Sequence, residues 1–283
     1  MSSKPIYNWN WFRTHMDICA SHSELECLPL LELINEFDAI VNGMVQREMS
    51  YGSERPQDFV VPILAVRAFR LGISSIRLAL SGYTDSASNI HRTIYEIGIR
   101  LLDMEQDPVA ASLGFLLQGA FEEISTMRAE FEYRENEHLK THHLSINIQT
   151  LKKHRNLLCE IAKNRGYDPE TIRKRFGKLN VREICQRYGI EKSYLVDYAY
   201  FSSYIHEKNV ATSHFYSESA DSRNFEFGPI SEDISYSIAD TMNNTIRVIE
   251  FGCIILKDKI LIERTQELSR LLSDRLKSLG MGE

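Results

Sequence analysis

Apolar residues recur at intervals of three and four along most of this chain, and this spacing restricts the fold more than any other feature. Such a pattern places apolar side chains on one face of an α-helix, whereas a half-buried strand would show strict alternation. The sequence therefore predicts an all-α fold, a multi-helix bundle of long amphipathic helices. Strand signals are scarce, and NFEFG at 224–228 is the one short candidate. The main helical stretches cover residues 30–44, 62–80, 85–104, 109–139, 145–165, 181–188, 192–206, 231–256 and 264–277.

The connectors between these helices are short, except for one loop at residues 207–230. That loop has no helical period and is rich in Ser, Asn and Asp. Loops of more than about 15 residues inside a compact domain are usually functional or disordered. A basic connector is expected at 166–180. We expect one domain over 1–283, in which a helical extension (1–56) packs on a core (57–262) and a charged helical tail (263–283) closes the chain.

Cysteine usage and hydropathy indicate the cellular compartment of the protein. The five cysteines are an odd number, widely scattered and without a CxxC pair, which predicts neither disulfides nor a zinc site. The N-terminus has no apolar run of signal-peptide length, and the apolar run Ile246–Leu256 is interrupted by Arg247 and Glu250. The sequence thus predicts a soluble cytoplasmic protein with no membrane partner.

Charge is distributed unevenly along the chain. The net charge is −6, yet residues 152–192 hold 12 Lys/Arg against 5 Asp/Glu, leaving −13 for the remainder. Two explanations stay open. This segment is a surface for an anionic partner such as RNA, or the basic and acidic patches pair within the fold or across a homodimer.

The sequence lacks the common nucleotide-binding motifs and has one stretch with the spacing of metal ligands. Neither GxxxxGK[ST] nor GxGxxG occurs, so we expect no cofactor. In ENEHLKTHH, Glu135 and His138, and His138 and His142, are spaced to share a helix face. A di-iron bundle needs a second ExxH pair and two further carboxylates, which the sequence lacks. We expect no metal, and these three residues are the only metal candidates.

The sequence gives no clear motif for binding or cleaving nucleic acid. Residues 181–206 resemble a helix-turn-helix with its turn at Gly189, but the second helix is too apolar to lie exposed in a major groove. All-α HEPN ribonucleases use an Arg followed by four to six residues and a His. Arg134 precedes His138 by three intervening residues and His142 by seven, so that motif is absent.

Two helices carry polar stripes where apolar residues are expected. Arg92 and Glu96 follow Ser88 at intervals of four, with Arg100 continuing the line. On the second helix, Tyr198, Ser202 and His206 recur at the same interval, while Tyr194, Phe201 and Ile205 form a core face. We predict that the two helices pack side by side, that the stripes form a shared polar cluster, and that 207–230 lies over it as a flap.

These stripes resemble a bacterial family known as domain of unknown function 5677. Its members show R-x-x-x-E, then DP, then Y-x-x-x-S-x-x-x-H before a loop. The resemblance covers about residues 62–256, although members typically have Gly where this chain has Glu207. The family has no established activity, so the resemblance implies only that the stripes act as one unit. The matching positions are Arg92, Glu96, Asp107, Pro108, Tyr198, Ser202 and His206.

Two functional hypotheses remain open. The first is a bacterial binding, interaction or regulatory protein, such as a defence component, that forms a homo-oligomer or binds a protein partner. The alternative is an RNA-directed hydrolase that uses His206 with Arg92. The catalytic candidates are Arg92, Glu96, Tyr198, Ser202 and His206.

Overall fold

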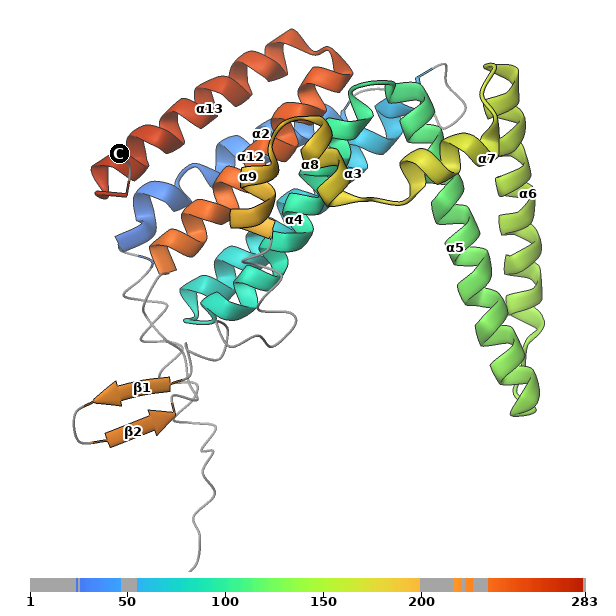
Figure 1. Cartoon of the computed structure of the whole chain (residues 1–283), viewed down its shortest axis with the longest axis horizontal. Coiled ribbons are helices and arrows are strands. Elements are labelled where there is room, and N and C mark those ends of the chain that lie inside the picture. Colours follow the sequence, from blue (N-terminus) through green and yellow to red (C-terminus); the bar gives the residue numbers. More distant parts are fainter. Residues whose placement is uncertain are drawn as a thin grey trace, which may run out of the picture.

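The computed structural model describes residues 24, 26–46, 55–198, 216–219, 222–225 and 234–281, and this part of the chain is almost entirely helical (Figure 1). The predicted all-α class is confirmed. One small hairpin interrupts it: β1 (Tyr216–Ser219) pairs antiparallel with β2 (Ser222–Phe225). The hairpin lies inside the long loop predicted at 207–230, and β2 includes the first two residues of the strand candidate NFEFG.

Five of the described helices form a bundle around a shared apolar core (Figure 1). The central helix of the bundle packs against two others along most of its length, and all three bury apolar residues at helical spacing. These three are α12 (Ile234–Leu256), α3 (Gln57–Leu80) and α4 (Thr84–Met104), and α2 (Ile34–Val45) and α13 (Lys259–Ser278) cover the outside.

The outer helices belong to the bundle rather than to a detached end. In α13, the residues Leu261, Thr265, Leu268 and Leu272 are buried, and the helix packs on α12 and α2. The tail boundary expected at residue 263 therefore falls inside a packed helix. The division into extension, core and tail stays a prediction.

A buried polar network crosses the bundle core. The ring Nε2 of His91 on α4 is hydrogen-bonded to the hydroxyl of Thr241 on α12, and Thr241 is also 3.0 Å from the hydroxyl of Ser75 on α3. His91 is 1% exposed, and burial lowers its pKa from 6.5 to about 4. The ring is therefore neutral at pH 7.

The helix α3 is long and apolar enough to cross a membrane by length and composition, the one such stretch among the residues described. Buried core helices of soluble proteins meet the same criterion. Half of the apolar window of α3 is buried within the bundle, against α4 and α12. Cytoplasmic localisation stays a prediction.

Two helices, α5 (Pro108–Asn136) and α6 (His142–Asn164), form a hairpin arm that stands away from the bundle (Figure 1). The predicted break is confirmed, because Asp107 caps α5 by accepting a hydrogen bond from the Ala110 amide at 3.0 Å. The tip differs from the prediction of helices over 109–139 and 145–165. His138 adopts a left-handed φ of 56°, which ends α5 early.

A segment that we call the strap (residues 166–190) returns from the arm and crosses α4. It was predicted to begin with a connector, and that prediction was wrong. The strap contains α7 (Pro169–Ile172), the π-helix η1 (Arg173–Gly177) and α8 (Val181–Arg187). The helix predicted over 192–206 starts as α9 (Glu191–Ser193) and the π-helix η2 (Tyr194–Tyr198), and the rest lies outside the described residues.

Candidate functional site

The predicted polar stripes meet at a cluster of Arg92 and Glu96 on α4 with Tyr198 on η2. Arg92 donates from Nε to Glu96 Oε1 at 3.1 Å and from Nη2 to the Tyr198 hydroxyl at 2.9 Å. The hydroxyl of Tyr198 donates in turn to Glu96 Oε1 at 3.2 Å. The Arg92 guanidinium also lies over the Tyr198 ring, 4.9 Å from its centre. Three of the five catalytic candidates are therefore in direct contact.

The other two candidates, Ser202 and His206, lie outside the described residues. So does most of the proposed flap at 207–230. A contact of His206 with Arg92 therefore stays a prediction, as does any catalytic role of the cluster.

The cluster keeps Tyr198 in its neutral phenol form. Burial and the neighbouring Glu96 raise the pKa of Tyr198, while Arg92 opposes this shift. Burial alone would lower the pKa of Arg92, but its hydrogen bond to Glu96 and the charges around it raise that pKa overall. A neutral phenol between an arginine and a carboxylate is suited to joining two chain segments rather than to acting as a nucleophile.

Behind the cluster, aromatic side chains build a small second core. Tyr194 stacks on Tyr198 with ring centres 5.2 Å apart, and Tyr95 of α4 lies 6.0 Å from Tyr198. Buried residues of α8, including Cys185, complete this core. Tyr194 thus lies on a core face, whereas Phe201 and Ile205 lie outside the described residues.

A cleft of about 660 Å³ opens between α3, α4, α5 and the strap, and Glu96 belongs to both the cluster and this cleft. Three cationic residues reach it from three different elements: Arg67 from α3, Arg100 from α4 and Lys178 from the strap. Sequence reasoning noted Arg100 only as an extension of the stripe and missed Arg67 and Lys178. The cleft is also lined by Leu64, Ile97, Phe115, Gln118, Glu122 and Leu179.

Arg100 connects the bundle to the strap. Its Nη1 donates to the carbonyl oxygen of Phe176 at 3.0 Å, with that of Gly177 at 3.5 Å, and its guanidinium lies over the Phe115 ring. Burial lowers the pKa of Arg100, and nearby Arg67 lowers it further, against the carboxylates of Asp103, Glu122 and Glu96. Arg100 remains a cation, since an arginine in a protein does not lose its proton at physiological pH.

The acidic side of the cleft is tied to the base of the arm. Gln118 donates from Nε2 to Glu122 Oε1 at 2.6 Å, and its own oxygen accepts a hydrogen bond from Arg173 at 2.8 Å. Arg173 and Arg155 both lie over the Phe121 ring, at 4.7 and 5.2 Å. These contacts hold α5, α6 and the strap in one arrangement beside the cleft.

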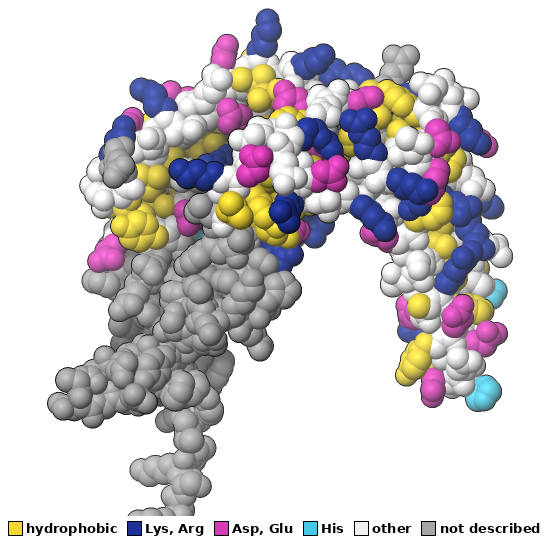
Figure 2. Space-filling model, viewed as in Figure 1, with side chains coloured by type: hydrophobic (Ala, Val, Ile, Leu, Met, Phe, Trp, Pro, Cys, Tyr) yellow, Lys and Arg dark blue, Asp and Glu magenta, His cyan; other side chains and the backbone are white. Residues whose placement is uncertain are grey.

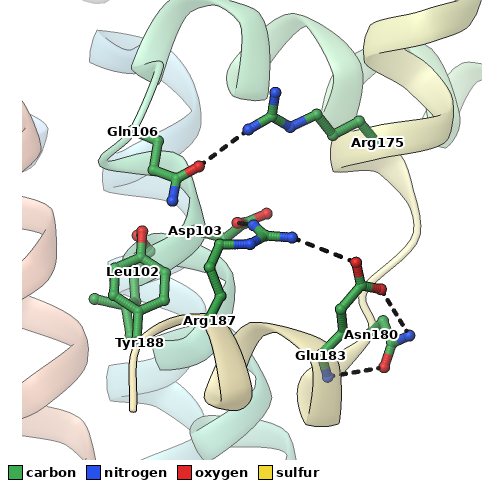
Figure 3. Close-up of polar contacts among 8 residues, drawn as sticks. All are labelled: Leu102, Asp103, Gln106, Arg175, Asn180, Glu183, Arg187 and Tyr188. Carbon is green, nitrogen blue, oxygen red and sulfur yellow. Dashed lines mark hydrogen bonds and ion pairs between the residues drawn. The ribbon is translucent and has the colours of Figure 1, made fainter. Parts of the chain in front are cut away.

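Polar contacts fix η1 and α8 of the strap to the end of α4 and the turn that follows it (Figure 3). Arg187 of α8 forms an ion pair with Asp103, and the Tyr188 hydroxyl donates to the Leu102 carbonyl at 2.7 Å. Arg175 donates to Gln106 at 3.0 Å. The strap is thus held at both ends, with Lys178 between them.

Two glycines allow the strap to approach α5 closely. A Cβ on Gly114 would collide with the carbonyl group of Ile172, and a Cβ on Gly177 would lie 2.5 Å from Cβ of Gln118. Both positions require a residue with no side chain. Neither was identified from the sequence, because a glycine in a predicted helix or connector gives no sign of what packs against it.

The metal candidates are separated by the turn of the arm. Glu135 is in the last turn of α5, His138 lies beyond the end of that helix, and His142 begins α6. The predictions that Glu135 and His138 share a helix face, and that His138 and His142 do, are therefore both wrong. Within the described ranges no group of three His, Cys, Asp or Glu side chains is placed to hold a metal ion.

Comparison with known proteins gives one match. Residues 58–224 fit the model of a family described as "Family of unknown function (DUF5677)". No curated protein and no solved structure matches the chain. The matched region includes α3, α4, the arm, the strap and Tyr198, and ends before α12 although the resemblance was expected to continue to Leu256. The chain belongs to the DUF5677 family of unknown function.

Proposed function

We propose that this protein is a regulatory binding protein that takes an anionic ligand in the cleft. The observation that carries the proposal is the convergence of Arg67, Arg100 and Lys178 on one cleft with no ion pair to any carboxylate of the described chain. Other cations of the same region are paired, as Arg92 is with Glu96 and Arg187 with Asp103.

The energetics favour an incoming anion. Burial lowers the pKa of Arg100, and the carboxylates of Asp103, Glu122 and Glu96 offset this only in part, with Arg67 as a like-charged neighbour. An anion bound between these side chains would relieve both effects. The cleft volume of about 660 Å³ lies in the range of small-molecule sites.

A thermal-shift titration with inorganic pyrophosphate at constant ionic strength tests the proposal. Ligand binding raises Tm by mass action, so wild type should gain stability with pyrophosphate concentration. Arg67→Ala and Lys178→Ala should lose most of that gain. Arg70→Ala is the matched control, because Arg70 is exposed on the same helix and lines only the neighbouring groove, which Arg67 also borders. A loss in both Arg67→Ala and Arg70→Ala but not in Lys178→Ala would place the anion in that neighbouring groove. Equal gains in all four proteins would contradict the proposal.

The alternative of an RNA-directed hydrolase has less support. Arg92 is engaged by Glu96 and Tyr198, which leaves less of its guanidinium to bind a phosphate. The basic segment 152–192 supports an anionic partner in either case. Lys178 belongs to that segment, and Figure 2 shows Lys and Arg side chains over the upper part of the arm, with acidic ones toward its tip.

A further inference from the structure

The cleft cations are arranged for an anion with several oxygens. Arg100 uses only Nη1 in its hydrogen bonds within the described chain, so Nε and Nη2 remain as donors. Arg67 and Lys178 make no hydrogen bond there, and both are exposed at the cleft. One planar carboxylate accepts a two-pronged bond from one arginine. Three cations from three elements match a phosphate group, whose terminal oxygens point in different directions.

The same cleft also presents hydrogen-bond acceptors, Glu96 on α4 and Glu122 on α5. Glu122 receives one hydrogen bond, from Gln118 to Oε1, and Glu96 uses Oε1 for both Arg92 and Tyr198. The Oε2 atom of each carboxylate accepts no hydrogen bond in the described chain. Carboxylates repel a ligand that is anionic throughout and attract hydroxyl or amino groups. The ligand therefore needs donors as well as a phosphate.

Apolar side chains complete the wall of the cleft. Leu64 and Ile97 come from the bundle, Phe115 from α5 and Leu179 from the strap. Such a surface suits the carbon face of a sugar or a flat ring. The two carboxylates also make an RNA strand a poorer fit, because its phosphates repeat along the whole length of the strand.

We infer that the cleft binds a phosphate monoester carried on a hydroxyl-bearing sugar, as in a sugar phosphate or a nucleoside monophosphate. This inference rests on the proposed function and deepens it. Arg67, Arg100 and Lys178 hold the phosphate, while Glu122 and Glu96 accept hydrogen bonds from the sugar. The apolar wall contacts the remainder of the ligand.

Calorimetric titration of the full chain tests the inference with four probes at one ionic strength: ribose 5-phosphate, AMP, inorganic phosphate and citrate. Ribose 5-phosphate or AMP should bind more tightly than citrate. Arg67→Ala and Lys178→Ala should each weaken that binding about tenfold or more, as expected for a lost charge-assisted hydrogen bond. Arg70→Ala should bind as wild type does. Tighter binding of AMP than of ribose 5-phosphate would assign a nucleotide, and equal binding a sugar phosphate.

Glu122→Gln separates the two halves of the site. The substitution keeps an oxygen to accept the Gln118 bond and removes the negative charge. It should weaken ribose 5-phosphate binding and leave inorganic phosphate binding unchanged or tighter. Citrate binding as tightly as either ester, or failure of both esters to bind while pyrophosphate still does, would overturn the inference and leave the anion cleft intact. Binding that is insensitive to Arg67→Ala and Lys178→Ala would overturn both this inference and the proposed function.

Discussion

Arg187 on α8 pairs with Asp103 on α4, 84 positions earlier in the chain. Burial raises the pKa of Asp103, and the Arg187 guanidinium opposes that rise. The Asp103 side chain is 10% exposed and that of Arg187 35%, so the pair lies at the edge of the interior. It fixes the end of the strap that is farther from the cleft (Figure 3).

Arg187→Ala should lower the free energy of unfolding by about 1–3 kcal/mol, because it leaves the Asp103 carboxylate buried without its cation. This expected loss of stability is smaller than the loss for a fully buried ion pair, since solvent screens part of the interaction. Chemical denaturation measures the change. Arg182→Ala is the control, an exposed arginine on the same helix, and should change stability by less than about 0.5 kcal/mol. An equal loss in both variants would argue against the pair as the cause.

Gly114 and Gly119 lie on the same helix and should respond in opposite directions to alanine. Gly114→Ala should destabilise the protein by about 1–3 kcal/mol, because the new Cβ meets the backbone of Ile172. Around Gly119 a Cβ would have nothing within 4 Å, so Gly119→Ala should stabilise by up to about 1 kcal/mol through helix propensity. Thermal and denaturant unfolding check both signs. A stabilising Gly114→Ala would contradict the close approach of the strap.

Acid should destabilise the fold through His91. The folded pKa of about 4 lies below the usual histidine pKa of 6.5, so between these two pH values the unfolded state binds the proton more readily. Stability due to this group is present above pH 6.5 and is lost as pH falls toward 4, by about 3 kcal/mol in all.

Denaturation curves from pH 7 to pH 4.5 should therefore slope less in His91→Gln than in wild type. The control is His143→Gln, an exposed position on α6, which should keep the wild-type slope. The absolute stability of His91→Gln is not the readout, because removing a buried hydrogen-bonded ring is itself destabilising. Identical slopes for His91→Gln and wild type would exclude His91 as the source.

The hydrolase alternative makes a separate prediction. If the protein only binds its ligand, purified wild type and His206→Ala should both leave RNA intact under the same conditions. Gel analysis of a labelled RNA measures this. Cleavage by wild type that is lost in His206→Ala, with unchanged thermal stability, would establish an enzymatic role for His206 and overturn the binding-only view.

Local chemistry made part of the fold predictable. The start of α5 followed from Asp107-Pro108, because capping and a first-turn proline act within one helical turn. The arm tip was misplaced because His138 adopts a left-handed conformation that its residue type does not announce. The strap was missed for another reason. Its π-helix is supported by contacts with Arg100 and Gly114, which are far away in sequence.

The candidate site likewise contains residues that could be recognised from the sequence and residues that could not. Arg92 and Glu96 were recognised by their spacing, and Tyr198 by its stripe, and the structure brings these three together. Arg67 and Lys178 were not recognised, because a single exposed cation on a helix or connector looks like any solvated surface residue. Only the folded arrangement shows that they face one cleft.

Arg100 holds the strap through main-chain oxygens, which every residue type provides. Substitutions at residue 176 or at Lys178 therefore leave this attachment available. The shape of the cleft wall thus depends on the main chain, whereas the chemistry of its lining depends on the side chains. Relatives can therefore change the lining of the cleft while keeping the scaffold that shapes it. Diversification within the family is then expected at the side chain of residue 178 before it reaches Arg100.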